Sequence, residues 1–91
     1  MDFDALPGGD LVSEGLEDLR RNAVTIPSLL VLIGAPRLRR LGLDVPVRPD
    51  PLPEHQLYAM LAAEDSDAAH SRYNALIRKL VSFERTAECA R

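Results

Sequence analysis

Apolar residues recur at helical spacing through most of the chain, beginning just after residue 10. Between residues 11 and 23 they fall four, three and four positions apart, at Val12, Leu16, Leu19 and Ala23. This spacing places them on one face of a helix. Asp10 is a suitable N-cap, because its short carboxylate accepts hydrogen bonds from the first free amides. The pattern therefore predicts a helix over residues 11–23.

The next segment is apolar on every side at its start and contains a proline in its middle. Thr25 can cap this helix, and Pro27 fits in its first turn. Residues 29–33 are all apolar, whereas Pro36 lacks an amide hydrogen and crowds the preceding turn, which predicts a kink or a break over 34–36. We predict a helix over 26–41. A buried strand at 29–33 is the alternative, because a short apolar run fits both structures.

The end of this segment has the pattern of a Schellman cap. Gly42 fits the left-handed position that follows a helix end, and Leu43 can fold back onto Leu38. Residues 44–53 then contain four prolines, which exclude a regular helix and favour an extended connector. At about 3.1 Å per residue such a connector spans some 30 Å.

Two further helices are predicted after the connector. The first starts near Pro53 and carries Leu57, Met60 and Leu61; the second covers residues 67–89. Apolar residues in the second alternate spacings of four and three, as in the seam of a helical bundle: Ala69, Tyr73, Leu76, Leu80, Phe83 and Ala87. Ile77 widens this seam.

Together these patterns predict an all-α fold, one small bundle-like domain over residues 1–91. It consists of two helical hairpins, about four helices, joined by the connector at 44–53. Residues 1–9 end in Pro-Gly-Gly and are expected to form a flexible arm, unless Phe3 and Leu6 dock on the domain.

Composition narrows the class of protein without identifying an activity. Of 91 residues, 46% are hydrophobic, and the net charge is −3, which gives no general attraction to nucleic acids or anionic membranes. The apolar runs are too short to span a bilayer. With a single cysteine, Cys89, and an acidic start unlike a signal peptide, we expect a cytoplasmic protein.

Residues with catalytic chemistry are few, so we predict that the chain is not an enzyme and has no cofactor or metal site. His55 and His70 belong to no recognisable catalytic or metal-binding motif. The densest basic cluster is Arg37, Arg39 and Arg40. It is a possible phosphate-binding site, but no aromatic residue is interleaved with it, so a solvated helix end or salt bridges to the acidic segments are favoured.

The features that point to a function concern association. The helix that contains residues 29–33 is apolar on all sides there and must be covered on all sides. The apolar seam of residues 67–89 is longer than any of the other predicted helices that could cover it. We therefore predict a protein–protein interaction module, a homodimer or a chain that binds a protein partner, without a membrane. The predicted partner-binding residues are Leu32, Tyr73, Leu76, Leu80 and Phe83. A nucleic-acid-associated protein that uses the arginine cluster is the alternative.

Overall fold

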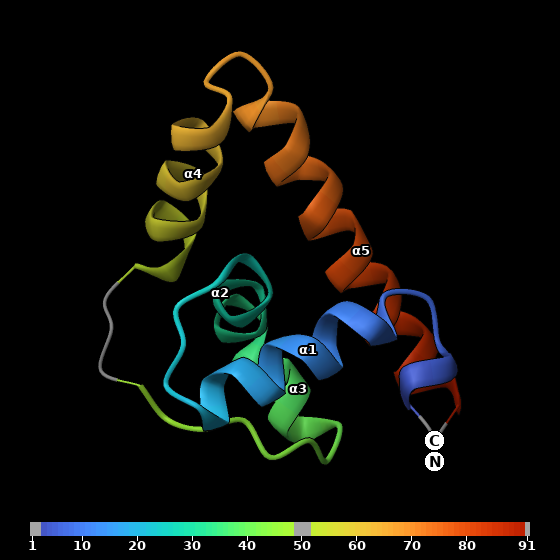
Figure 1. Cartoon of the computed structure of the whole chain (residues 1–91). Coiled ribbons are helices and arrows are strands. Elements are labelled where there is room, and N and C mark those ends of the chain that lie inside the picture. Colours follow the sequence, from blue (N-terminus) through green and yellow to red (C-terminus); the bar gives the residue numbers. More distant parts are fainter. Residues whose placement is uncertain (1–2, 49–51, 91) are drawn as a thin grey trace.

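The computed structural model describes residues 3–48 and 52–90, and over these ranges the protein is all-α with no strand (Figure 1). A short 3₁₀ helix precedes five α-helices: η1 (Phe3–Ala5), α1 (Gly9–Arg20), α2 (Ile26–Ile33), α3 (Ala35–Arg40), α4 (Pro53–Glu64) and α5 (Ala69–Ala90). Helices α1 and α2 form one hairpin, and α4 and α5 form the other. The predicted fold class is confirmed, and the strand considered for residues 29–33 is wrong because they lie in α2.

Helix α2 lies at the centre of the molecule. It contacts α1, α4 and α5, and it continues into α3. Leu29, Leu30 and Val31 are each exposed by no more than 1%, so the all-apolar helix is covered on every side over these residues. Leu32 and Ile33, at its end, are only half-buried.

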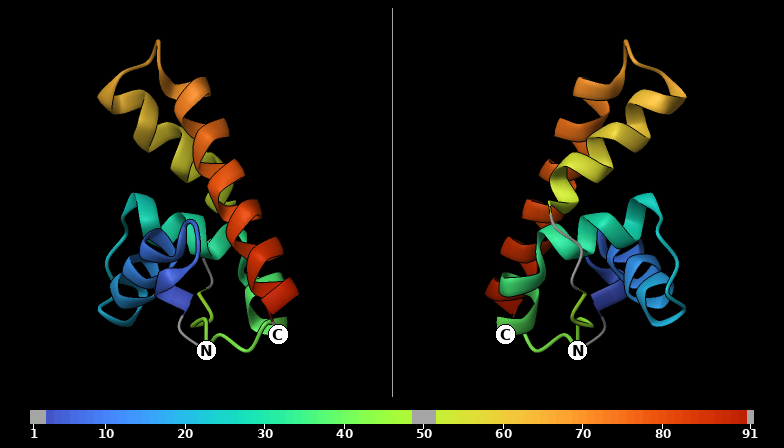
Figure 2. Two further views of the ribbon diagram at one scale, coloured as in Figure 1. Left: turned by 90° about the vertical axis from the view of Figure 1, so that its right-hand side faces the viewer. Right: turned by 90° about the vertical axis from the view of Figure 1, so that its left-hand side faces the viewer.

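Helix α5 connects the two ends of the molecule. It descends from the tip of the α4–α5 hairpin, past α2, to the region where both chain ends lie (Figure 2). At the tip, Tyr73 lies against Tyr58 of α4, with ring centroids 5.8 Å apart. Farther along, Leu80, Phe83 and Ala87 are buried in the core. Within the described part of the chain, no helix combines the length and the apolar composition needed to cross a membrane.

The N-terminal segment is packed rather than free over the part that the structure describes. The Phe3 ring lies 5.8 Å from the Phe83 ring, and Leu6 packs against the core. The Ser13 hydroxyl donates a hydrogen bond to the Asp4 carboxylate. The condition stated for an ordered arm, that Phe3 and Leu6 dock on the domain, is therefore met over residues 3–9.

Helix α1 begins and ends earlier than its sequence pattern predicts. It starts at Gly9 with Gly8 as N-cap, because the Leu6 carbonyl accepts the Gly9 amide and Asp10 is not needed as a cap. It ends at Arg20, because Asn22 adopts φ 59° and the Ala23 amide donates back to the Asp18 carbonyl. That bond is typical of a Schellman motif, which closes the helix three residues before Ala23.

The turn between α1 and α2 is held by a capping box. The Ser28 amide donates to the Thr25 hydroxyl oxygen at 3.2 Å, and the Thr25 amide donates to the Ser28 hydroxyl at 2.8 Å. The Thr25 hydroxyl also donates to the buried Asp18 carboxylate at 2.6 Å. This bond, and a second one from Arg21, lower the pKa of Asp18 below its ordinary value. The predicted cap at Thr25 is confirmed.

The predicted break after α2 and the cap after α3 are also confirmed. Gly34 separates α2 from α3, and Pro36 occupies the first turn of α3. Gly42 adopts φ 100°, and the Leu43 amide donates to the Leu38 carbonyl at 3.1 Å. Beyond this cap, residues 49–51 of the connector lie outside the described residues. Helix α4 begins at Pro53 as predicted, and α5 begins at Ala69 rather than at residue 67.

The close approach of α1 to α2 gives the first test. A Cβ atom at Gly15 would overlap with the Pro27 carbonyl oxygen and come within 2.5 Å of Val31 Cγ2. Alanine normally stabilises a helix relative to glycine by about 1 kcal/mol, but here we expect Gly15→Ala to destabilise the protein by about 1–3 kcal/mol because the hairpin must open.

Chemical denaturation measures this change, and the exposed neighbour Glu14→Ala serves as the control. We expect the control to change stability by less than about 0.5 kcal/mol. A Gly15→Ala variant more stable than the wild type would contradict the close packing of α1 on α2.

Candidate functional site

A groove runs along α5, beside the end of α2 and beside α3. It consists of three adjoining hollows of about 230, 300 and 520 Å³. The first two share Arg37 and Arg40, and the second and third share Ile77 and Val81. We call this feature the α3–α5 groove. From Ile77 to Glu88 it follows α5 for eleven residues, or about 16 Å at 1.5 Å per residue.

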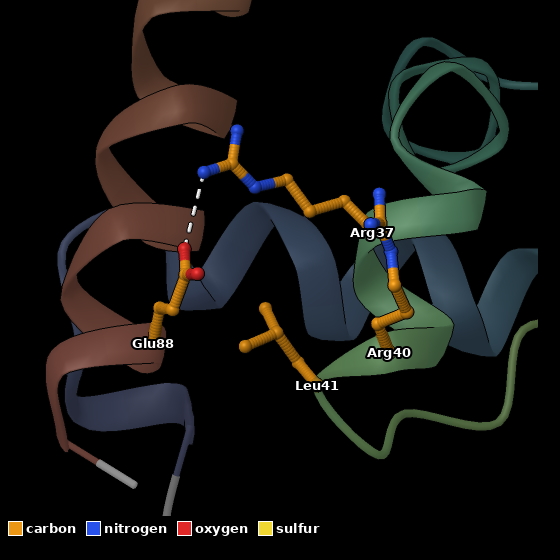
Figure 3. Close-up of a pocket in the computed structure, with 4 residues that line it drawn as sticks. All are labelled: Arg37, Arg40, Leu41 and Glu88. Atoms are coloured by element: carbon orange, nitrogen blue, oxygen red, sulfur yellow. Dashed lines mark hydrogen bonds and ion pairs between the residues drawn. The ribbon is translucent and has the colours of Figure 1, made fainter.

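One side of the groove is formed by the end of α2 and by α3. Ile33 and Pro36 supply apolar surface there, and Arg37 and Arg40 supply charge. In Figure 3, Arg37 reaches from α3 across to Glu88 of α5, while Arg40 stays on the α3 side. The Arg37 guanidinium lies 3.1 Å from the Glu88 carboxylate. This ion pair bridges the groove at one end.

The other side of the groove is formed by α5 alone. Ile77 and Val81, one turn apart, are both half-buried. Ile77 packs against the core, whereas Val81 is not among the side chains that do so. Arg78 and Arg85 lie on the outer edge, exposed and two turns apart. Within residues 3–48 and 52–90, neither arginine makes an ion pair or a hydrogen bond. The groove thus has an apolar floor between arginines on both edges.

Glu84 is the one buried acidic residue that lines the groove among the described residues. Its side chain is 5% exposed, and its carboxylate lies 3.9 Å from the Arg37 guanidinium, too far for a hydrogen bond. It packs at the Gly34 position, where an added Cβ would lie 3.0 Å from the carboxylate oxygen. Burial raises the pKa of Glu84; the charge of Arg37 opposes this shift and the charge of Glu88 adds to it.

The predicted phosphate-binding arginines serve different purposes in the structure. Arg37 pairs with Glu84 and Glu88. The Arg39 guanidinium donates to the Val45 carbonyl at 3.1 and 3.2 Å, and so holds the start of the connector against α3. Arg40 lies on the edge of the groove. The structure therefore brings Arg37 and Arg40 to one site, and Arg39 to another.

The predicted partner-binding residues divide into two groups. Leu32, Tyr73 and Leu76 are half-buried and pack against the core from its edge. Leu80 and Phe83 are 4% and 0% exposed, so they belong to the core of this chain. Among these five residues only Leu80 lines the groove, at its floor.

The sequence prediction missed the outer residues of the groove, although a signal for them exists. On α5, the residues that directly follow the apolar seam residues form a second stripe with the same spacing. This second stripe includes Ile77, Val81, Glu84 and Glu88. Two apolar residues at its centre, flanked by Arg78 and Arg85, mark a second contact face. The exposure of this stripe depends on where α3 lies relative to α5, which the sequence pattern did not determine.

Among the described residues, the groove contains no cluster suited to metal binding. Within the described ranges, His, Cys, Asp and Glu side chains form no group of three that could hold a metal ion. His70 bonds to Asn74 at 3.2 Å on the exposed side of α5, and His55 is exposed at the start of α4. Comparison of the chain with models of known protein families, with curated proteins and with solved structures finds no match.

The buried carboxylate in the groove gives a pH-dependent test. The pKa of Glu84 is higher in the folded state than in the unfolded state, so its charged form lowers the stability of the protein at neutral pH. Below the ordinary carboxyl pKa of 4.5, Glu84 is protonated in both states, and this loss of stability is absent. We expect the Glu84→Gln variant to gain stability relative to the wild type at pH 7. The gain should shrink as the pH falls through the raised pKa.

Urea denaturation of both proteins between pH 4 and pH 8 measures this difference. A gain that grows on acidification, or that stays constant across the range, would contradict the assignment of Glu84 as a buried, destabilised carboxylate.

Proposed function

We propose that the chain is a helical protein–protein interaction module and that the α3–α5 groove is its binding surface. The observation that carries the proposal is the partial exposure of Ile77 and Val81 on the longest helix, beside a hollow that, among residues 3–48 and 52–90, is lined by α5 alone. Apolar side chains gathered in a groove with charged edges are typical of sites that bind another protein.

The arrangement of α2 supports this proposal. Its first residues are covered by α1, α4 and α5, but its last residue, Ile33, opens into the groove. The same apolar surface that forms the core thus continues to the outside at this point. A partner that covers Ile33, Ile77 and Val81 would extend the core, with a stabilisation of roughly 25 cal/mol for each Å² of apolar surface removed from water.

The nucleic-acid alternative is less well supported. Phosphate binding requires basic side chains without competing carboxylates, and Arg37 is already paired with Glu84 and Glu88. The apolar floor of the groove offers nothing to a sugar–phosphate backbone, and neither tyrosine of the chain lines the groove for base stacking. A cytoplasmic location remains part of the proposal, on the basis of the single cysteine.

Site-specific photo-cross-linking in the cells that produce the protein tests the proposal. Replacing Val81 with a photoreactive phenylalanine derivative places the probe in the groove, and the same replacement at Lys79 places it on an exposed position of the same helix outside the groove. We expect one discrete protein adduct from position 81 and none from position 79, with its identity and cross-linked segment determined by mass spectrometry.

An adduct with a second copy of this chain would show that the module acts as a homodimer. Equal adducts from both positions, adducts with nucleic acid, or no adduct would contradict the proposed function.

A further inference from the structure

We infer that the α3–α5 groove takes an amphipathic helix of a different protein, one whose apolar stripe is flanked by carboxylates on the side that faces α5. This inference rests on the proposed function and specifies the chemistry of the partner. It follows from the shape of the groove, from the charges along its edges and from the surfaces that a second copy of the chain would offer.

The shape of the groove fits a helix. Its length of about 16 Å equals three helical turns, and its floor presents apolar side chains from two directions, Ile33 and Pro36 from one edge and Ile77 and Val81 from the other. A helix that carries apolar residues at positions i, i+3 or i+4, and i+7 places them in such a groove.

The charges along the α5 edge determine what flanks that apolar stripe. Arg78 and Arg85 on the α5 edge have no acidic partner within the described part of the chain, and they stand seven residues apart, the spacing of two helical turns. Arg40 lies on the α3 edge. The two acidic residues of the groove, Glu84 and Glu88, face Arg37. A carboxylate on the flank of a docked helix that faces α5 would therefore meet Arg78 or Arg85.

A second copy of this chain offers no such helix among its described residues. Helix α1 is acidic on its exposed side, but its apolar residues Val12, Leu16 and Leu19 are buried. Helix α4 carries acidic residues only at its two ends, Glu54 and Glu64. The complementary surface therefore belongs to a different protein.

Three synthetic peptides of about 18 residues, long enough to be helical, test this inference. All carry the same leucine stripe, and the positions on both flanks are Glu in the first, Gln in the second and Lys in the third. Fluorescence anisotropy measures their binding to the wild-type protein. We expect the Glu peptide to bind about tenfold more tightly than the Gln peptide, since several exposed ion pairs contribute, and the Lys peptide to bind most weakly.

The double variant Arg78→Glu, Arg85→Glu should reverse this order, so that the Lys peptide binds best. Both residues are exposed, and circular dichroism confirms that the variant is folded. The matched control is the double variant Arg20→Glu, Lys79→Glu, which makes the same change in net charge away from the groove and should change binding of the Glu peptide by less than about twofold.

Several results would overturn the inference: no binding of the Glu peptide, equal binding of the Glu and Gln peptides, no reversal in the variant, or tighter binding of a labelled DNA duplex. A dimer in light scattering that competes with the Glu peptide would assign the groove to a second copy. If cross-linking at position 81 still finds one protein partner, the interaction module stands and only the predicted partner chemistry fails. If cross-linking finds none, the proposed function itself fails.

Discussion

The fold depends on the burial of α2, a short helix with apolar residues on all sides. Each fully buried leucine or valine contributes roughly 1.5–3 kcal/mol, against a total stability of about 5–15 kcal/mol for a domain of this size. Leu29, Leu30 and Val31 each meet this condition. Because no single neighbour can cover a helix on every side, α1, α4 and α5 must all pack around it. This requirement explains why the connector brings the second hairpin onto the first.

The same requirement explains the position of the groove. Cover for α2 is complete at its centre and incomplete at its end, where Gly34 and Pro36 redirect the chain into α3. Helix α3 diverges enough to leave a hollow against α5, which the Arg37–Glu88 ion pair bridges at its far end (Figure 3). The groove is thus a continuation of the core to the surface.

The elements and their order could be predicted from the sequence because each has a clear local pattern, such as the cap at Thr25 and the Schellman cap at Gly42. Whether the arm is ordered could not be predicted, because the docking of Phe3 on Phe83 joins residues 80 positions apart, which no local pattern records. The site was predicted only in part for the same reason. The apolar seam of α5 was identified, but which stripe is buried and which lines a groove depends on the packing of α3.

Native-state hydrogen exchange tests the central role of α2 most directly. The amides of Leu29 to Gly34 donate within this helix, starting from the bond of Leu29 to the Thr25 carbonyl. If the fold is built around α2, these amides exchange only by global unfolding and are among the slowest in the protein, slower than those of residues 69–76 at the hairpin tip. Exchange of the α2 amides at a lower free energy than those at the tip would contradict this account.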